Sequence, residues 1–211
     1  MESLIIQSFY GGYDQNFVYL ITDKFSGEQC LIDAAIPFSN IEKFIPDNLS
    51  SLLITHSHGD HIAYLDDISH VFTSINIFSF SQQNSTKYSV QAIRDSQIIK
   101  LGNTKINVLH TPGHFPDSVC FLINNALFTG DTLFVGRTGR TISQGSDVRK
   151  LYQSVYSKLL TLPKDTLIFP GHNYGPKPTI TLGENIQISP LLQAINEQDF
   201  IARMDQYEVN R

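Results

Sequence analysis

The sequence lacks the features that mark secreted proteins. Only two cysteines occur among its 211 residues. Each lies inside an apolar, strand-like run, EQCLIDA for Cys30 and SVCFLI for Cys120. Isolated cysteines in such surroundings predict buried, reduced thiols rather than a disulfide framework, and they indicate a cytoplasmic protein. The N-terminal segment MESLIIQSFYGGYDQ has an acidic second residue and too short an apolar run for a secretory signal.

Long apolar runs and clusters of positive charge are also missing. Polar residues interrupt every apolar stretch before it reaches the length of a transmembrane helix. The formal net charge is −5, and no Lys/Arg cluster is present that would follow a nucleic-acid backbone or an anionic membrane. Low-complexity segments, heptads and internal repeats are absent too. We therefore expect a single domain over residues 1–211 that binds neither nucleic acid nor a membrane.

Short apolar runs with turn punctuation alternate with helical segments along the chain. The strand candidates are LIIQSF, NFVYLITD, QCLIDA, SLLIT, NIFSF, KINVLH, SVCFLI, ALFTG and TLIFPGH. Helices are expected at residues 39–44, 62–71 and 147–162, and in the tail at LGENI and NEQDFIARM; Asp147 suits the N-cap of the third. This alternation, without strict βαβ regularity, predicts an α/β fold in which two sheets face each other with helices outside.

The most informative stretch is HSHGDH at residues 56–61, directly after the apolar run SLLIT. Side chains at the exit of a buried strand point to the cleft where α/β proteins hold ligands. Imidazole nitrogen and carboxylate oxygen are ligands of Zn²⁺ and other first-row metals. Without a metal, so many ionisable side chains in one turn would repel one another. The stretch therefore predicts a metal site.

Three further segments place a histidine or an aspartate at a strand exit: TPGH at His114, FTGD at Asp131 and FPGH at His172. Each alone is weak evidence, because Asp131 also suits a turn after glycine. Beside the HSHGDH cluster, the three become predicted ligands. His70 and His110 stand outside these patterns, and we expect them to be solvated or hydrogen-bonded side chains.

The spacing of these residues suits two metal ions. In an extended or tightly turned segment, residues i and i+2 can point the same way, so HSHGDH is able to serve two ions. A carboxylate has two oxygens and can bridge ions about 3.5–4 Å apart, where a shared water ionises near pH 7. The predicted ligands are His56, His58 and His114 for the first ion, Asp60, His61 and His172 for the second, and Asp131 for both.

In this order and at these separations, THSHGDH, TPGH, FTGD and PGH resemble the metallo-β-lactamase superfamily, from QCLIDA to the tail. GDTLFVGRTGRT, LYQSVYSKLLTLPKDTLIFPGHNYG and TITLGENIQISPLL resemble the branch of glyoxalase II and the persulfide dioxygenases. The resemblance implies an αββα sandwich of two mixed β-sheets with helices on the outer faces. It also implies metals at the edge of the two sheets, with the same division of ligands.

Both related families act on substrates that carry glutathione, so the resemblance implies a small, glutathione-derived substrate. Arg140 in GRTGR resembles the basic residue that meets a glutathione carboxylate. Tyr174 in HNY stands where glyoxalase II has a substrate-contacting tyrosine. On the sequence alone, Arg140 is equally well explained as a surface arginine. The alternative for Tyr174 is a side chain packed beside Pro170 and Pro176.

Two reactions fit this branch. Hydrolysis of a thioester such as a hydroxyacylglutathione would use two divalent ions, Zn or Zn with Fe. Metal-bound hydroxide would attack, with Asp60 and Asp131 as catalytic residues. The alternative is a mononuclear iron persulfide dioxygenase acting on glutathione persulfide, with one Fe held by His56, His114 and Asp131.

The branch motifs divide between these reactions. The helix and tail motifs favour the dioxygenase, since glyoxalase II proper carries a further helical region and only 39 residues follow His172. Against it, Thr138 replaces the cysteine of GCGRTDF-like segments, and Ile142-Ser143 replace Asp-Phe. We predict a hydrolase. Lactone hydrolysis and a metal-binding protein without turnover stay open, whereas a nuclease would need an extra domain and a secreted β-lactamase a signal peptide.

Overall fold

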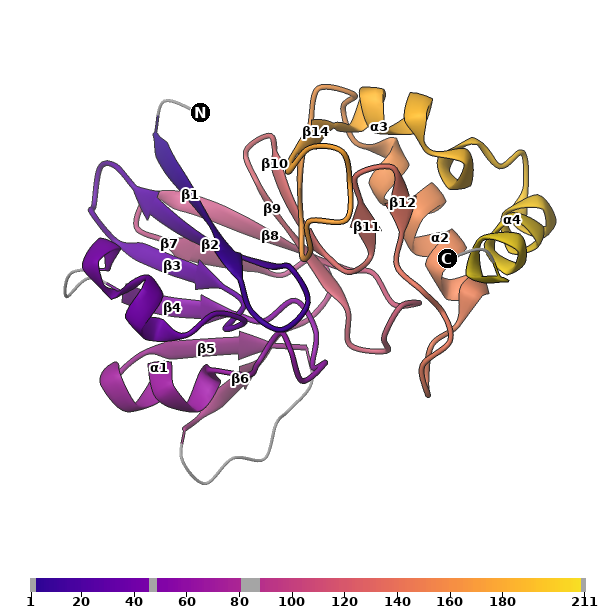
Figure 1. Ribbon diagram of the computed structural model, residues 1–211. Coiled ribbons are helices and arrows are strands. Elements are labelled where there is room, and N and C mark those ends of the chain that lie inside the picture. Colours follow the sequence, from indigo (N-terminus) through magenta and orange to yellow (C-terminus); the bar gives the residue numbers. More distant parts are fainter. Residues whose placement is uncertain (1–2, 46–48, 81–87, 210–211) are drawn as a thin grey trace.

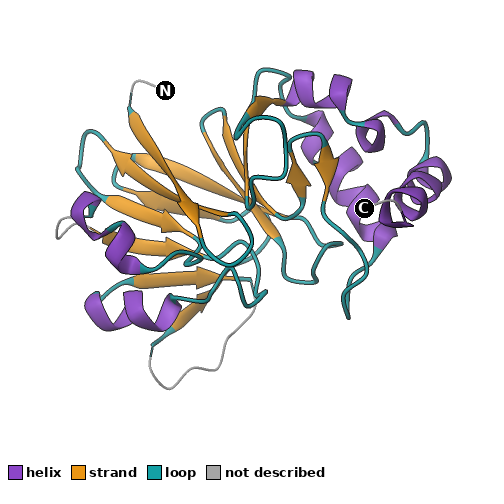
Figure 2. Ribbon diagram, viewed as in Figure 1, coloured by secondary structure: helices purple, strands orange, loops and turns teal. Residues whose placement is uncertain are grey.

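The computed structural model describes residues 3–45, 49–80 and 88–209. Two six-stranded β-sheets face each other, and helices cover their outer faces (Figures 1 and 2). Each sheet contains both parallel and antiparallel strand pairs. The predicted α/β sandwich of two mixed sheets is therefore confirmed.

The first sheet has the strand order β1-β2-β3-β4-β5-β6. Its strands are β1 (Leu4–Gly11), β2 (Asn16–Asp23), β3 (Gln29–Ile32), β4 (Leu49–Leu53), β5 (Asn76–Ser79) and β6 (Val90–Ala92). The pairs up to β3 are antiparallel, and those from β3 to β6 are parallel. Helix α1 (Leu65–Val71) covers its outer face, where Leu65 and Ile68 join a buried cluster with Leu20, Leu31 and Leu52.

Two predicted helices differ from the structure near this sheet. Residues 39–44 lie in two 3₁₀ turns, η1 (Phe38–Asn40) and η2 (Glu42–Phe44), which are closed by backbone hydrogen bonds from Ile41 to Phe38 and from Ile45 to Glu42; Pro46 itself lies outside the described residues. The helix expected from Ile62 begins at Leu65, since residues 58–62 form turns that place the HSHGDH side chains.

The second sheet has the order β14-β13-β10-β9-β8-β7. Its strands are β7 (Ile98–Leu101), β8 (Thr104–His110), β9 (Val119–Ile123), β10 (Ala126–Gly130), β13 (Leu167–Pro170) and β14 (Ile180–Thr181), and a separate ribbon pairs β11 (Leu133–Phe134) with β12 (Arg137–Thr138). The outer helices are α2 (Val148–Ser157), η3 (Leu159–Thr161), α3 (Leu182–Ile188), η4 (Pro190–Gln193) and α4 (Glu197–Val209). The short strands β6, β7, β11, β12 and β14, of two to four residues each, were not expected.

Helix α2 confirms the predicted N-cap, because the Asp147 side chain accepts hydrogen bonds from the backbone N–H groups of Arg149 and Lys150. The helix is shorter than expected: it ends at Ser157, and η3 replaces its last turn. The tail segments LGENI and NEQDFIARM are helical as predicted, in α3 and α4.

The buried apolar residues form three clusters, one between the two sheets and one on the outer side of each sheet. The cluster between the sheets contains Tyr19, Phe121 and Phe128, and the Tyr19 hydroxyl donates to the carbonyl of Pro170 at 2.6 Å, so this bond joins the sheets. Cys30 and Cys120 are buried and free, as predicted, and burial raises the pKa of both thiols, that of Cys120 to about 11. The packed sheets fix the loops at their common edge.

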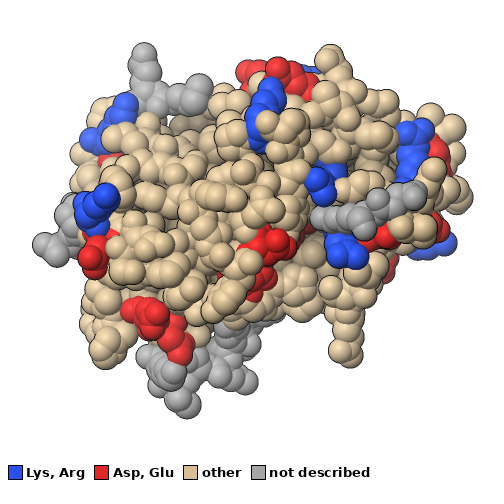
Figure 3. All heavy atoms as spheres, in the orientation of Figure 1, with Lys and Arg blue, Asp and Glu red and all other residues tan. Residues whose placement is uncertain are grey.

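Charged side chains of both signs lie on the face drawn in Figure 3, where acidic and basic side chains are interspersed. Within the part of the chain that the structure describes, no helix has the length and apolar character needed to cross a membrane.

Candidate metal centre

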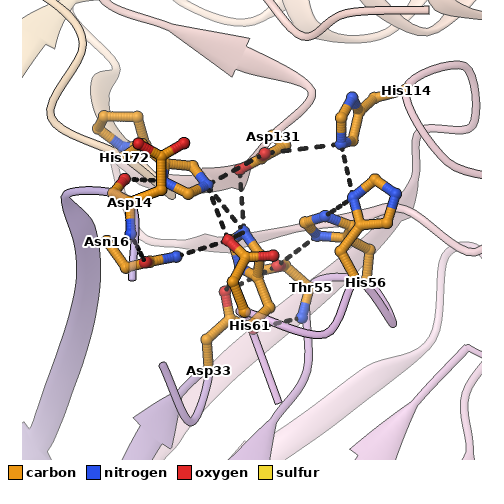
Figure 4. A network of polar contacts seen from close by, with 12 residues as sticks. Asp14, Asn16, Asp33, Thr55, His56, His61, His114, Asp131 and His172 are labelled. Carbon is orange, nitrogen blue, oxygen red and sulfur yellow. Dashed lines mark hydrogen bonds and ion pairs between the residues drawn. The ribbon is translucent and has the colours of Figure 1, made fainter. Parts of the chain in front are cut away.

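Four loops at one edge of the sandwich bring the predicted ligands together. The segment 56–61 follows β4, His114 follows β8, Asp131 directly follows β10, and His172 follows β13. Figure 4 shows the side chains of five of these ligands converging from both sheets: His56, His61, His114, Asp131 and His172. Three groups have ligand atoms within 4.8 Å of one another: His56, His58 and His114; His56, His61 and Asp131; and Asp60, His61 and His172. The first and third groups are the predicted ligand sets of the two ions.

Contacts within each set are short. His58 Nδ1 lies 2.9 Å from His56 Nε2 and 3.0 Å from His114 Nε2. In the second set, His61 Nε2 lies 3.1 Å from His172 Nε2. Asp60 Oδ2 is 3.6 Å from His61 Nε2 and 3.3 Å from His172 Nε2.

Asp131 lies between the two sets. Its Oδ2 is 3.2 Å from His172 Nε2 in the second set and 3.5 Å from His114 Nε2 in the first. Its Oδ1 is 3.2 Å from His61 Nε2, yet it is buried and accepts no hydrogen bond. A buried carboxylate oxygen without a donor suits an atom that binds a cation.

In three of the histidine rings, Nδ1 contacts a backbone carbonyl or a carboxylate, and this contact determines whether Nε2 is available as a ligand. His114 Nδ1 donates to the carbonyl of Arg140 at 2.9 Å, and His172 Nδ1 to the carbonyl of Asp14 at 2.5 Å. His61 Nδ1 lies 2.8 Å from the Asp33 carboxylate. Each neutral ring then has a lone pair on Nε2, directed into the shared space. Two facing lone pairs repel unless a cation lies between them, so the donor set fits divalent metal ions.

Burial and neighbouring charges shift the pKa values of the side chains at the centre. Burial opposes protonation of His61 and His172, but the Asp131 carboxylate outweighs it and raises the pKa of both imidazoles. Burial alone would raise the pKa of Asp131; His61 and His172 instead hold it well below its usual range. Burial lowers the pKa of His56 and His58, and neighbouring imidazoles lower it further. A cation entering the second set therefore displaces protons.

Comparison with known proteins agrees with this arrangement. The family model of the metallo-beta-lactamase superfamily matches residues 87–172. A hydroxyacylglutathione hydrolase of Francisella tularensis subsp. novicida (strain U112) is 26% identical, over 93% of this chain and 90% of its own length. The crystal structure of ETHE1 from Myxococcus xanthus is 28% identical with a TM-score of 0.84, covering 96% of this chain and 91% of that one.

A metallo-beta-lactamase from Staphylococcus aureus subsp. aureus COL is 27% identical with a TM-score of 0.85, covering 97% of this chain and 67% of that one. This chain is thus similar to proteins of the metallo-β-lactamase superfamily along nearly its whole length. Its similarity within that superfamily extends to hydroxyacylglutathione hydrolases and to ETHE1.

Residues that the sequence analysis missed support the histidines and Asp60. The buried Asp33 accepts hydrogen bonds from the backbone N–H and hydroxyl of Thr55, both at 2.8 Å, and also contacts His61. The buried Asn16 donates from Nδ2 to Asp60 Oδ2 at 2.8 Å. Asp33 ends the run QCLID and so shares the strand-exit signal of the ligands. Asn16 begins a strand, and nothing in the sequence marked it.

A pocket of 390 Å³ opens beside this candidate metal centre and contains both predicted substrate residues, Arg140 and Tyr174. The Tyr174 ring stacks on His172, with centroids 4.8 Å apart and planes 2° apart, and its hydroxyl donates to the Asp14 carboxylate. Tyr174 therefore lies beside a predicted metal ligand. The complete lining is Asp14, Asp60, His114, Asp131, Phe134, Arg137, Arg140, His172 and Tyr174.

Proposed function

We propose that this protein is a metal-dependent hydrolase of a thioester such as a hydroxyacylglutathione. The observation that carries the proposal is the pair of ligand sets joined by Asp131, at a pocket that also presents arginine and tyrosine side chains. The similarity to hydroxyacylglutathione hydrolases supports the choice of substrate class.

The proposed centre holds two divalent ions, Zn or Zn with Fe. Such ions, when bound, polarise a substrate carbonyl and lower the pKa of a water molecule towards about 7, so that hydroxide is available near neutral pH. The proposed ligands are His56, His58 and His114 for the first ion, Asp60, His61 and His172 for the second, and Asp131 for both.

The chain's own residues position the reactants. Asp131 is buried between the ligand sets, so its carboxylate fixes their spacing. The Asp60 side chain is 29% exposed and lines the pocket, where its carboxylate would orient a water molecule. Asn16 Nδ2 donates to Asp60 Oδ2 and so holds this carboxylate in place. Arg140 and Tyr174, on the pocket wall, are the proposed substrate contacts.

The proposal is tested by thiol release from S-lactoylglutathione. The wild-type protein should release glutathione, and Arg140→Ala should raise KM with metal content unchanged, because the variant loses a contact with a substrate carboxylate. An unchanged KM would remove Arg140 from the substrate site. Absence of thiol release by metal-loaded wild-type protein would contradict thioester hydrolysis.

A second candidate is a mononuclear iron dioxygenase acting on glutathione persulfide, with one Fe held by His56, His114 and Asp131. The similarity to ETHE1 over 96% of this chain favours it. Oxygen uptake with glutathione persulfide by protein that contains one Fe per chain would support this reaction and contradict the hydrolase.

A further inference from the structure

Two arginines border the pocket, and they differ in their partners. Arg140 is exposed, and its Nε donates to Glu208 Oε2 on α4 at 2.9 Å. Arg137, on β12, is half-buried. Among residues 3–45, 49–80 and 88–209, no carboxylate forms an ion pair with its guanidinium. A substrate carboxylate must therefore compete with Glu208 for Arg140, whereas Arg137 has no such competitor.

Arg137 is also held in place beside the centre. Its Nη2 donates to the carbonyl of Tyr174 at 2.5 Å, and its guanidinium carbon lies 5.4 Å from the centroid of the Tyr174 ring. That ring stacks on His172. A guanidinium has five N–H donors in a planar fork, and the Tyr174 carbonyl takes one of them. The remaining donors leave a fork that matches a carboxylate.

The acidic side chains of the pocket already have partners. Asp14 accepts from the Tyr174 hydroxyl, and Asp60 accepts from Asn16. Asp131 lies among the histidines of both ligand sets. Within the described residues, none of these three acids forms an ion pair with Arg137.

We propose that Arg137 is a specificity-determining residue whose guanidinium binds a carboxylate of the substrate, so that the pocket selects anionic over neutral thioesters. The inference rests on the proposed hydrolase function and deepens it. Arg137 is then the main binding residue for the substrate carboxylate. Arg140 is a weaker contact, because its ion pair with Glu208 must first break.

The test compares two thioesters with the same acyl group: S-lactoylglutathione, which is anionic, and S-lactoyl-N-acetylcysteamine, which is neutral. For Arg137→Leu, we expect KM for the glutathione thioester to rise about tenfold, with a change of less than about threefold for the neutral one. Arg137→Lys should recover part of the loss, because it keeps the charge without the fork. Arg140→Leu, the matched control, should have the smaller effect.

A merely structural role for Arg137 predicts a different result. If Arg137→Leu only disturbed the Tyr174 segment, KM and kcat would change alike for both thioesters, and the proposal would be wrong. An unchanged KM for S-lactoylglutathione would overturn it as well.

Binding of unreactive S-methylglutathione separates this inference from the proposed function. Calorimetry on metal-loaded protein should show Kd about tenfold higher for Arg137→Leu than for wild type. If the wild type cleaves neither thioester, the hydrolase proposal fails, and the Kd comparison still decides on Arg137. If the wild type cleaves both but fails to bind S-methylglutathione, or if Kd is unchanged in the variant, the assignment of Arg137 is wrong and the hydrolase proposal stands.

Discussion

Asp131 has the most consequential position of any single side chain at the centre. Its two oxygens lie within 3.5 Å of imidazole nitrogens from both ligand sets. We expect Asp131→Ala to lose more metal than any other single ligand variant and to abolish turnover, because both ions lose a ligand. Metal content by mass spectrometry and thiol release check this, with the exposed Asp165→Ala as control. A variant that kept both ions and full activity would show that Asp131 does not bridge.

Asn16 provides a more selective test. Its Nδ2 holds Asp60, and its Oδ1 accepts from the backbone N–H of Asp14, whose carbonyl accepts from His172. Asn16→Ala should therefore lower the affinity for the second ion by about tenfold or more and the affinity for the first ion far less. A two-step metal titration measures both affinities. An equal loss of affinity for both ions would contradict the positioning role of Asn16 and indicate a general loss of structure.

At the residue scale, the sequence predicted the seven converging side chains because each lies at or just after a strand exit. It could not predict their supports. Asn16 is 44 residues from Asp60, and Glu208 is 68 residues from Arg140, so these contacts depend on which loops meet in space. The metal role of the seven residues stays a prediction until ions are measured.

At the scale of elements, Asp23 joins the two sheets. It ends β2 and accepts hydrogen bonds from the Thr104 hydroxyl at 2.7 Å and from the backbone N–H groups of Asn103, Ser26 and Phe25. These hydrogen bonds, that of Thr104 first, lower its pKa to about 2. The folded-state pKa thus lies below the unfolded value of about 3.9.

A depressed carboxylate pKa stabilises the fold above the unfolded pKa, and this contribution is lost as the pH falls towards the folded value. We therefore expect the urea midpoint of the wild type to fall more steeply between about pH 4 and pH 2 than that of Asp23→Asn, which has no titrating group there. Parallel pH dependence of the two proteins would contradict the assigned role of Asp23.

The elements also show where sequence patterns fail. Apolar runs bounded by turn residues located β1, β2 and β9, and the Asp147 cap located α2. The segment 39–44 was expected to be helical, but its backbone forms only 3₁₀ turns, a distinction that its local composition does not mark. Two-residue strands such as β11 and β14 exist only through their partners, so no local pattern marks them.

At the scale of the molecule, the fold places parallel strand pairs β3–β4 and β10–β13 so that their carboxyl ends meet at one edge. The sequence predicted two facing sheets with outer helices, because strand-like runs alternate with helical segments without strict βαβ regularity and because its motifs resemble the superfamily. The pairing of Arg140 with α4 and the exposure of Arg137 to the pocket arise only when the second sheet and its helices pack together.

The central claim is that the seven side chains form a site for two divalent ions that serves hydrolysis. Metal identity and number in protein purified anaerobically, read together with thiol release from S-lactoylglutathione, test it most directly. The account predicts two ions per chain, Zn or Zn with Fe, and stoichiometric release of glutathione. A protein that binds no metal after incubation with zinc, or that holds one Fe and consumes oxygen with glutathione persulfide, would contradict it.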